Sequence, residues 1–141
     1  MRNTILLLSG LTMLLMLDGC KYPEGPAVSL NTPTARISRG WTLVQATDKD
    51  GADVSERFEN TYTFTESGDA FAEIEILNID TDFEGKWSLD NEDTEFDLEL
   101  VDVLTGLFAY ERSYAIQRLT QEEFWLIDLN DSTNIQLQAT E

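Results

Sequence analysis

Histidine is absent from this sequence of 141 residues, and cysteine occurs only once. Without imidazoles and with a single thiol, the chain cannot build a thiolate–imidazole zinc site or an internal disulfide. The commonest general base of enzymes is missing too. Carboxylate pairs can also catalyse reactions, as in glycoside hydrolysis, but no pair stands out among the 27 acidic residues. We therefore expect no metal, no cofactor and no enzymatic activity.

Basic residues are also scarce, because nine Lys and Arg stand against 27 Asp and Glu, for a formal net charge of −18. Such a charge repels nucleic-acid phosphates and anionic lipid headgroups, so nucleic acid is not an expected partner. The acids are dispersed, which favours a general role in solubility, although cationic partners stay open. With 42% hydrophobic residues, the chain has enough apolar material for one small folded domain.

A hydrophobic run long enough to span a membrane is missing. The apolar run from Ile5 to Leu17 would reach about 20 Å as a helix, against about 30 Å of hydrocarbon. Preceded by Arg2, this run has the layout of a secretory signal peptide. The next residues, Leu17-Asp18-Gly19-Cys20, resemble the lipobox of bacterial lipoproteins. The resemblance implies that residues 1–19 are removed and that a lipid on Cys20 anchors the protein to a membrane.

Proline is scarce, and two of the three prolines stand with a glycine directly after Cys20, in Tyr22–Pro26. Regular structure is disfavoured there, so we expect a flexible tether over residues 20–33. Thr34 is in a position to cap a short helical turn over residues 35–38. Such a turn is too short to be stable alone, and it would plug one end of a closed barrel.

From Trp41 onward, apolar and polar residues alternate, which is typical of strands with one buried face. The clearest case is Glu95–Leu100, where three acids would face water and three apolar side chains the core. Clusters of Asp, Asn, Ser and Gly separate the runs and predict turns. The expected strands lie near residues 41–44, 62–65, 71–76, 86–89, 95–100, 109–118, 123–128 and 134–138. Residues 34–141 are thus predicted to form an all-β, roughly eight-stranded, antiparallel up-and-down barrel.

Several segments then follow one another as in the small lipocalin-like lipoproteins of Bacteroidota-type bacteria, which the chain resembles. These segments are Cys20, Tyr22–Pro26, Ser29-Leu30, Ala35-Arg36-Ile37, Trp41–Val44, Phe58–Thr65, Gly85–Leu89 and Arg118–Leu126. The resemblance implies a lipocalin-like barrel with a ligand-sized interior, held at the outer membrane on a face that the sequence does not fix. It also implies that Trp41 closes the barrel, and Arg118 is the expected cation–π partner of Trp41.

Aromatic residues on the expected strands are the candidates for a ligand cavity, although a barrel this small favours the alternative that they fill the interior. They are Tyr62, Phe64, Trp87, Phe96, Phe108, Tyr114 and Trp125. The leading hypothesis is a membrane-anchored module that binds a small apolar or amphipathic ligand. The alternative is an interaction or inhibitor protein with a filled barrel, which docks on a protein partner in the cell envelope.

Two acidic segments have some features of calcium loops. Asp80–Gly85 matches the first half of such a loop, but the twelfth position is Asn91 rather than a bidentate glutamate. Asp48–Asp53 also brings three carboxylates together, yet Asp and Gly are the residues that ordinary turns use. We interpret the first segment as an acidic connection into a strand and the second as a turn.

Overall fold

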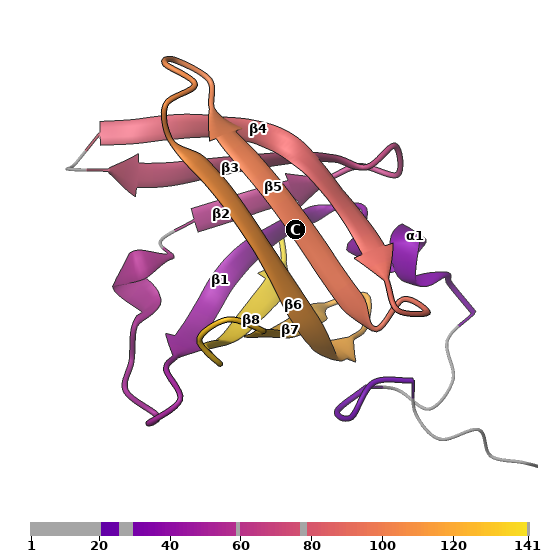
Figure 1. The fold of residues 1–141 in the computed structure, drawn as a ribbon. Coiled ribbons are helices and arrows are strands. Elements are labelled where there is room, and N and C mark those ends of the chain that lie inside the picture. The colour runs from indigo at the N-terminus through magenta and orange to yellow at the C-terminus, as the bar shows by residue number, and fades with distance from the viewer. Residues whose placement is uncertain (1–20, 26–29, 59, 77–78, 141) are drawn as a thin grey trace, which may run out of the picture.

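A computed structural model describes residues 21–25, 30–58, 60–76 and 79–140, with only the backbone described at Asn60 and residues 74–76. Each strand pairs antiparallel with the next one along the chain, and β8 pairs with β1, so the sheet closes into a barrel (Figure 1). The predicted all-β, eight-stranded up-and-down barrel is confirmed. The elements are α1 (Pro33–Ile37), β1 (Gly40–Thr47), the 3-10 turn η1 (Ser55–Arg57), β2 (Asn60–Phe64), β3 (Asp69–Ile76), β4 (Ile79–Asp90), β5 (Glu95–Asp102), β6 (Ala109–Leu119), β7 (Glu123–Asp128) and β8 (Asn134–Ala139).

The barrel has two ends, which are named here by their connections. The α1 end carries α1 and the β2–β3, β4–β5 and β6–β7 turns. The far end carries the β1–β2, β3–β4, β5–β6 and β7–β8 loops. Figure 1 shows α1 near the point where β4 finishes, and the β5–β6 loop projecting from the opposite end.

β4 is longer than the sequence indicated. Asp80–Gly85 was expected to be a connection, but it is strand and pairs with β3 and β5. The alternation explains this, because Phe83 and Trp87 are buried while most of the residues between them face outward. Gly85 permits a close approach of β4 to β5, since a Cβ there would lie 1.9 Å from the carbonyl oxygen of Glu99.

α1 begins two residues earlier than predicted. The side chain of Thr32, and not that of Thr34, caps the helix by accepting a hydrogen bond from Ala35 N at 3.2 Å. Pro33 occupies the first helical position, where its missing N–H costs nothing. None of the helices in the described ranges is long and apolar enough to cross a membrane.

The segment after Cys20 is only partly a tether. Residues 21–25 are docked on the α1 end, which corrects the expectation of a flexible stretch over 20–33. Tyr22 is 1% exposed, and its hydroxyl donates to the main-chain oxygen of Asp93 at 3.0 Å. The amide of Glu24 donates to the oxygen of Gln117 at 2.7 Å. Cys20 itself, like residues 1–19, lies outside the described residues, so its lipidation stays a prediction.

The core lies inside the barrel and centres on Phe96. Its ring makes edge-on contacts with Phe64 and Phe124, each at a centroid distance of 5.2 Å, and lies 5.8 Å from Trp87. Small residues, Ala70 and Ala72, occupy inward positions on β3. Aromatic rings therefore account for much of the packing in the middle of the barrel.

Candidate functional site

The interior of the barrel is the site that the sequence suggested first. The space in its middle has a volume of about 20 Å³. That is room for about one water molecule, whereas ligand pockets usually measure about 300–1,000 Å³. The space is lined by Tyr62, Phe64, Phe96, Leu98, Tyr114, Leu126, Ile135 and Leu137. The described side chains thus fill the barrel here rather than surround a ligand-sized cavity.

Of the seven aromatic candidates, four are buried in this packed interior: Phe64, Trp87, Phe96 and Tyr114. Tyr62 is half-buried, stacks on Phe64 at 6.2 Å and lines the same small space. The structure therefore brings five of the seven together, as expected, but in contact with one another.

Two tyrosines of the interior pair through their hydroxyl groups. The hydroxyls of Tyr110 and Tyr114 are hydrogen-bonded. Burial raises the pKa of Tyr110 to about 12 and raises the pKa of Tyr114 further above its ordinary value. Both phenols are therefore neutral at physiological pH. The guanidinium of Arg112 lies 5.8 Å from the Tyr110 ring and 3.6 Å from the buried carboxylate of Asp128.

Trp125 and Phe108 do not line the interior, and their assignment to it was wrong. Trp125 lies between the buried Phe124 and Leu126 on β7, so alternation points its side chain outward. Phe108 is 57% exposed, because β6 begins only at Ala109 and the loop before it turns away from the barrel. On β6 itself the even-numbered positions 114 and 116 are buried, but that parity does not extend into a loop.

Trp41, the residue expected to close the barrel, lies near the start of β1 at the α1 end. Trp41 is fully buried, packs on Phe124 at 5.4 Å and donates from Nε1 to the oxygen of Ile37 at 2.8 Å. Arg118, however, does not stack on Trp41, which corrects that expectation. Its guanidinium lies 5.2 Å from the ring of Trp125, since both residues lie on the outside of the β6–β7 pair.

A buried arginine in α1 belongs to the same end of the barrel, although the resemblance named Arg36 only as part of a segment and gave it no role. Arg36 is 5% exposed, donates to the main-chain oxygen of Leu119 and lies 5.8 Å from the Tyr22 ring. The contacts link α1, β6 and the segment 21–25. No local signal marks Arg36 for this role, because its partners lie far away along the chain.

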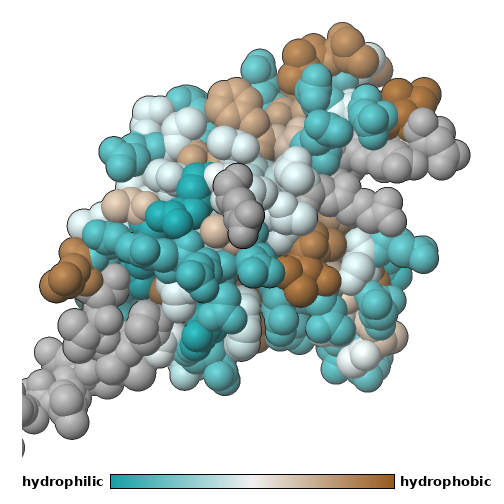
Figure 2. Space-filling model, turned by 180° about the vertical axis from the view of Figure 1, so that it is seen from behind, coloured by the Kyte–Doolittle hydropathy of each residue, from teal (hydrophilic) through white to brown (hydrophobic). Residues whose placement is uncertain are grey.

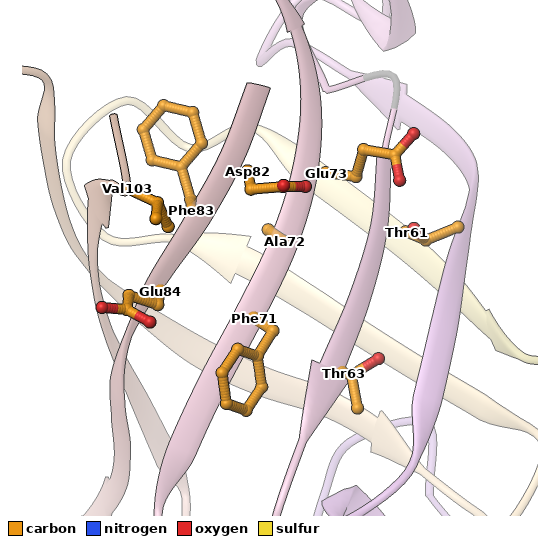
Figure 3. A pocket seen from close by; sticks show the side chains of 9 residues that line it. All are labelled: Thr61, Thr63, Phe71, Ala72, Glu73, Asp82, Phe83, Glu84 and Val103. Carbon is orange, nitrogen blue, oxygen red and sulfur yellow. The ribbon is translucent and has the colours of Figure 1, made fainter. Parts of the chain in front are cut away.

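On the outside of the barrel, β2, β3 and β4 form a groove of about 360 Å³ (Figure 3). Phe71 lies in it, 45% exposed, and Val103 borders it from the β5–β6 loop. Its lining comprises Thr61, Thr63, Phe71, Ala72, Glu73, Asp82, Phe83, Glu84 and Val103. The sequence contained a signal for an exposed apolar side chain here. Ala70, Phe71 and Ala72 are three successive apolar residues, and a strand cannot bury all of them on one face.

The second external feature is an apolar tip, defined here as the exposed residues Val101, Val103, Leu104, Leu107 and Phe108 at the β5–β6 connection. Leu104 and Leu107 are 80% and 81% exposed. Figure 2 shows hydrophobic residues gathered at the top of the molecule, the height at which Figure 1 places this loop. Isolated exposed leucines are common, whereas a contiguous exposed apolar group is unusual on the surface of a monomer.

The apolar tip is held in one shape by the buried carboxylate of Asp102. Its oxygens accept hydrogen bonds from Phe108 N at 2.9 Å, and from the hydroxyl and N of Thr105 at 2.8 and 2.7 Å. These bonds, led by that from Phe108 N, lower the pKa of Asp102 to about 2. The loop is therefore a defined projection.

In the acidic loop 48–53, the carboxylate of Asp48 accepts hydrogen bonds from backbone amides of its own loop, as that of Asp102 does. One oxygen of Asp48 accepts from the amides of Asp50 and Ala52, each at 2.9 Å. This is the ordinary turn that was expected. Across the described part of the chain, no group of three or more acidic, Cys or His residues is placed to hold a metal ion.

Comparison with known proteins adds support for the fold. No protein-family model matches the chain, and no curated protein matches it. A solved structure described as a redesigned beta barrel superposes with a TM-score of 0.51, over 81% of this chain and all of the other. The two are 14% identical in sequence. At that identity the likeness concerns the fold alone.

Proposed function

We propose that this protein is a membrane-anchored, non-catalytic interaction module. The barrel acts as a rigid scaffold, and the outer surface docks on a protein partner in the cell envelope. The observation that carries this proposal is the packed interior, with a central space of about 20 Å³. A small ligand would have to displace ring contacts such as Phe64–Phe96 in order to enter. The alternative from the sequence is therefore favoured over the ligand-binding hypothesis.

The anchor and the docked segment together favour one orientation. Lys21 follows Cys20 directly, and its Nζ lies 2.8 Å from the carboxylate of Asp93, in the β4–β5 turn. A lipid on Cys20 would therefore be held near the α1 end. β5 leads away from that turn for eight residues, a rise of about 26 Å, to the apolar tip. The tip would then face away from the membrane that carries the anchor.

Native mass spectrometry tests this function against ligand binding. The barrel closes between residues 40 and 139, so a chain that begins at Lys21 keeps the docked segment and the whole sheet. Secreted from its own host behind an ordinary signal peptide, this chain should give its bare mass under native conditions. A stoichiometric small molecule that is released on unfolding would overturn the proposal and restore the ligand-binding hypothesis.

A further inference from the structure

We propose that the groove and the apolar tip form one docking surface, and that its partner is a protein face combining apolar side chains with Lys or Arg. The proposal rests on the proposed function and names the surface that would carry it. The two features are continuous, because Val103 belongs to the tip and also borders the groove. Its amide donates to the oxygen of Asp82 at 2.9 Å, which fixes the tip against β4.

The groove carries negative charge that the protein does not neutralise. None of the ion pairs among the described residues uses Glu73, Asp82 or Glu84. Glu73 lies directly opposite Asp82 in the β3–β4 register. Like charges in such cross-strand positions destabilise a sheet. A cationic side chain placed between them would remove this repulsion, so the groove is complementary to Lys or Arg.

The apolar part of the surface is already ordered. Asp102 holds the loop, so Leu104 and Leu107 would lose little backbone freedom when a partner covers them. Burial of two leucines that are about four-fifths exposed removes apolar surface from water, which favours association. The adjoining carboxylates select against purely apolar partners, because an unpaired carboxylate is costly to bury.

A lipid bilayer and a second copy of the chain are less suitable partners for this docking surface. A lipid bilayer would bring Asp82 and Glu84 towards headgroups and hydrocarbon, and the docked segment 21–25 places the anchor at the opposite end of the barrel. A second copy of the chain would bring another net charge of −18 against these acids. A partner also cannot add a strand to the sheet, because the closed sheet has no free edge. The partner must therefore bind through side chains.

Photocrosslinking in the native host identifies the occupant. A benzoylphenylalanine is placed at Leu104 in the full-length chain, and a matched one at Leu129, which is 51% exposed in the β7–β8 connection of the same end. The photoreactive residue at position 104 should yield a defined adduct with a protein, and the one at position 129 should not. An adduct with a second copy or with lipid, or equal adducts at both positions, would overturn this surface.

The partner identified by crosslinking is then purified, and its affinity for variants of this protein tests which charges and apolar side chains it recognises. Glu73→Lys and Leu104→Asp should each weaken its affinity at least tenfold, and added salt should weaken the wild-type complex. The matched controls are Leu129→Asp and Glu111→Lys, because Glu111 also lies opposite an acid, Glu99, but outside the groove. Circular dichroism checks that all variants fold. Equal losses in the controls, or none in Glu73→Lys, would overturn the proposal.

The two proposals fail in different ways. If crosslinks to a protein arise from other outward positions but not from Leu104, the protein is still an interaction module and only this surface is wrong. If instead the native mass shows a bound small molecule and no outward position gives a protein adduct, the proposed function itself is wrong.

Discussion

The hydroxyl of Tyr22 donates to the main-chain oxygen of Asp93, so a residue two positions after the expected lipid attachment is part of the folded barrel. Burial raises the pKa of this phenol to about 12, so it stays a donor at any physiological pH. Arg36 completes the contact by lying 5.8 Å from the ring. Residues 21–25 are therefore held against the β4–β5 turn.

Tyr22→Ala should release the segment 21–25 without unfolding the barrel. The amide of Glu24, which is bonded to Gln117, should lose its protection in hydrogen exchange. The loss in global stability cannot exceed the docking free energy of the segment. It should therefore be smaller than that of Trp41→Ala, which removes a fully buried side chain from β1 and should cost about 3–5 kcal/mol.

Denaturant unfolding of the two variants gives the comparison, and Tyr22→Phe is the matched control, since it keeps the ring and removes only the hydrogen bond to Asp93. If Tyr22→Ala destabilises the barrel as much as Trp41→Ala does, the segment belongs to the cooperative core and is not a docked extension.

Asp102→Asn should destabilise the protein in a manner that depends on pH. The folded-state pKa of Asp102, about 2, lies below the unfolded value of 3.8. Its stabilising contribution is therefore fully present above about pH 4 and is lost as the pH falls through about 2. The difference in unfolding free energy between wild type and variant should shrink over this interval. A difference that stays constant between pH 5 and pH 2 would contradict the assigned role of the carboxylate.

Period-two alternation predicted the barrel well where one residue in two is apolar. Phe96, Leu98 and Leu100 are buried as expected, and β7 has the predicted bounds, Glu123–Asp128. Alternation could not decide the orientation of Trp125, because Phe124-Trp125-Leu126-Ile127 is apolar throughout and either face could be buried. Phe108 was misplaced for a different reason, since strand parity is lost where a loop begins.

Long-range relationships were beyond the reach of sequence patterns. Tyr22 stands among prolines and glycines, and its partner Asp93 is 71 residues away. The groove depends on register, because Glu73 and Asp82 face each other only once the β3–β4 pairing is known. Whether the barrel holds a cavity also depends on how the rings of Phe64, Phe96 and Phe124 pack, which composition does not reveal.

Gly85→Ala should destabilise the barrel through a steric clash. The added Cβ would lie 1.9 Å from the carbonyl oxygen of Glu99, so β4 and β5 would have to separate. Such overpacking costs about 1–3 kcal/mol. Gly106→Ala is the matched control, because a Cβ there meets nothing within 4 Å and only the positive φ of 65° is unfavourable, at about 1–2 kcal/mol. Amide hydrogen exchange should show lost protection in β4 and β5 only for Gly85→Ala. Equal protection in both variants would exclude the clash.

Tryptophan fluorescence distinguishes the outward ring from the two inward ones. Trp41 and Trp87 are 0% and 6% exposed, whereas Trp125 lies on the outer surface under the guanidinium of Arg118. Acrylamide is the suitable quencher, because it is neutral and the net charge of −18 repels iodide. The wild type should show one quenchable fraction, and Trp125→Phe should remove it, while the matched variant Trp87→Phe should retain it. Quenching that persists in Trp125→Phe would mean that the quencher reaches Trp41 or Trp87, and the burial of these two rings would then be wrong.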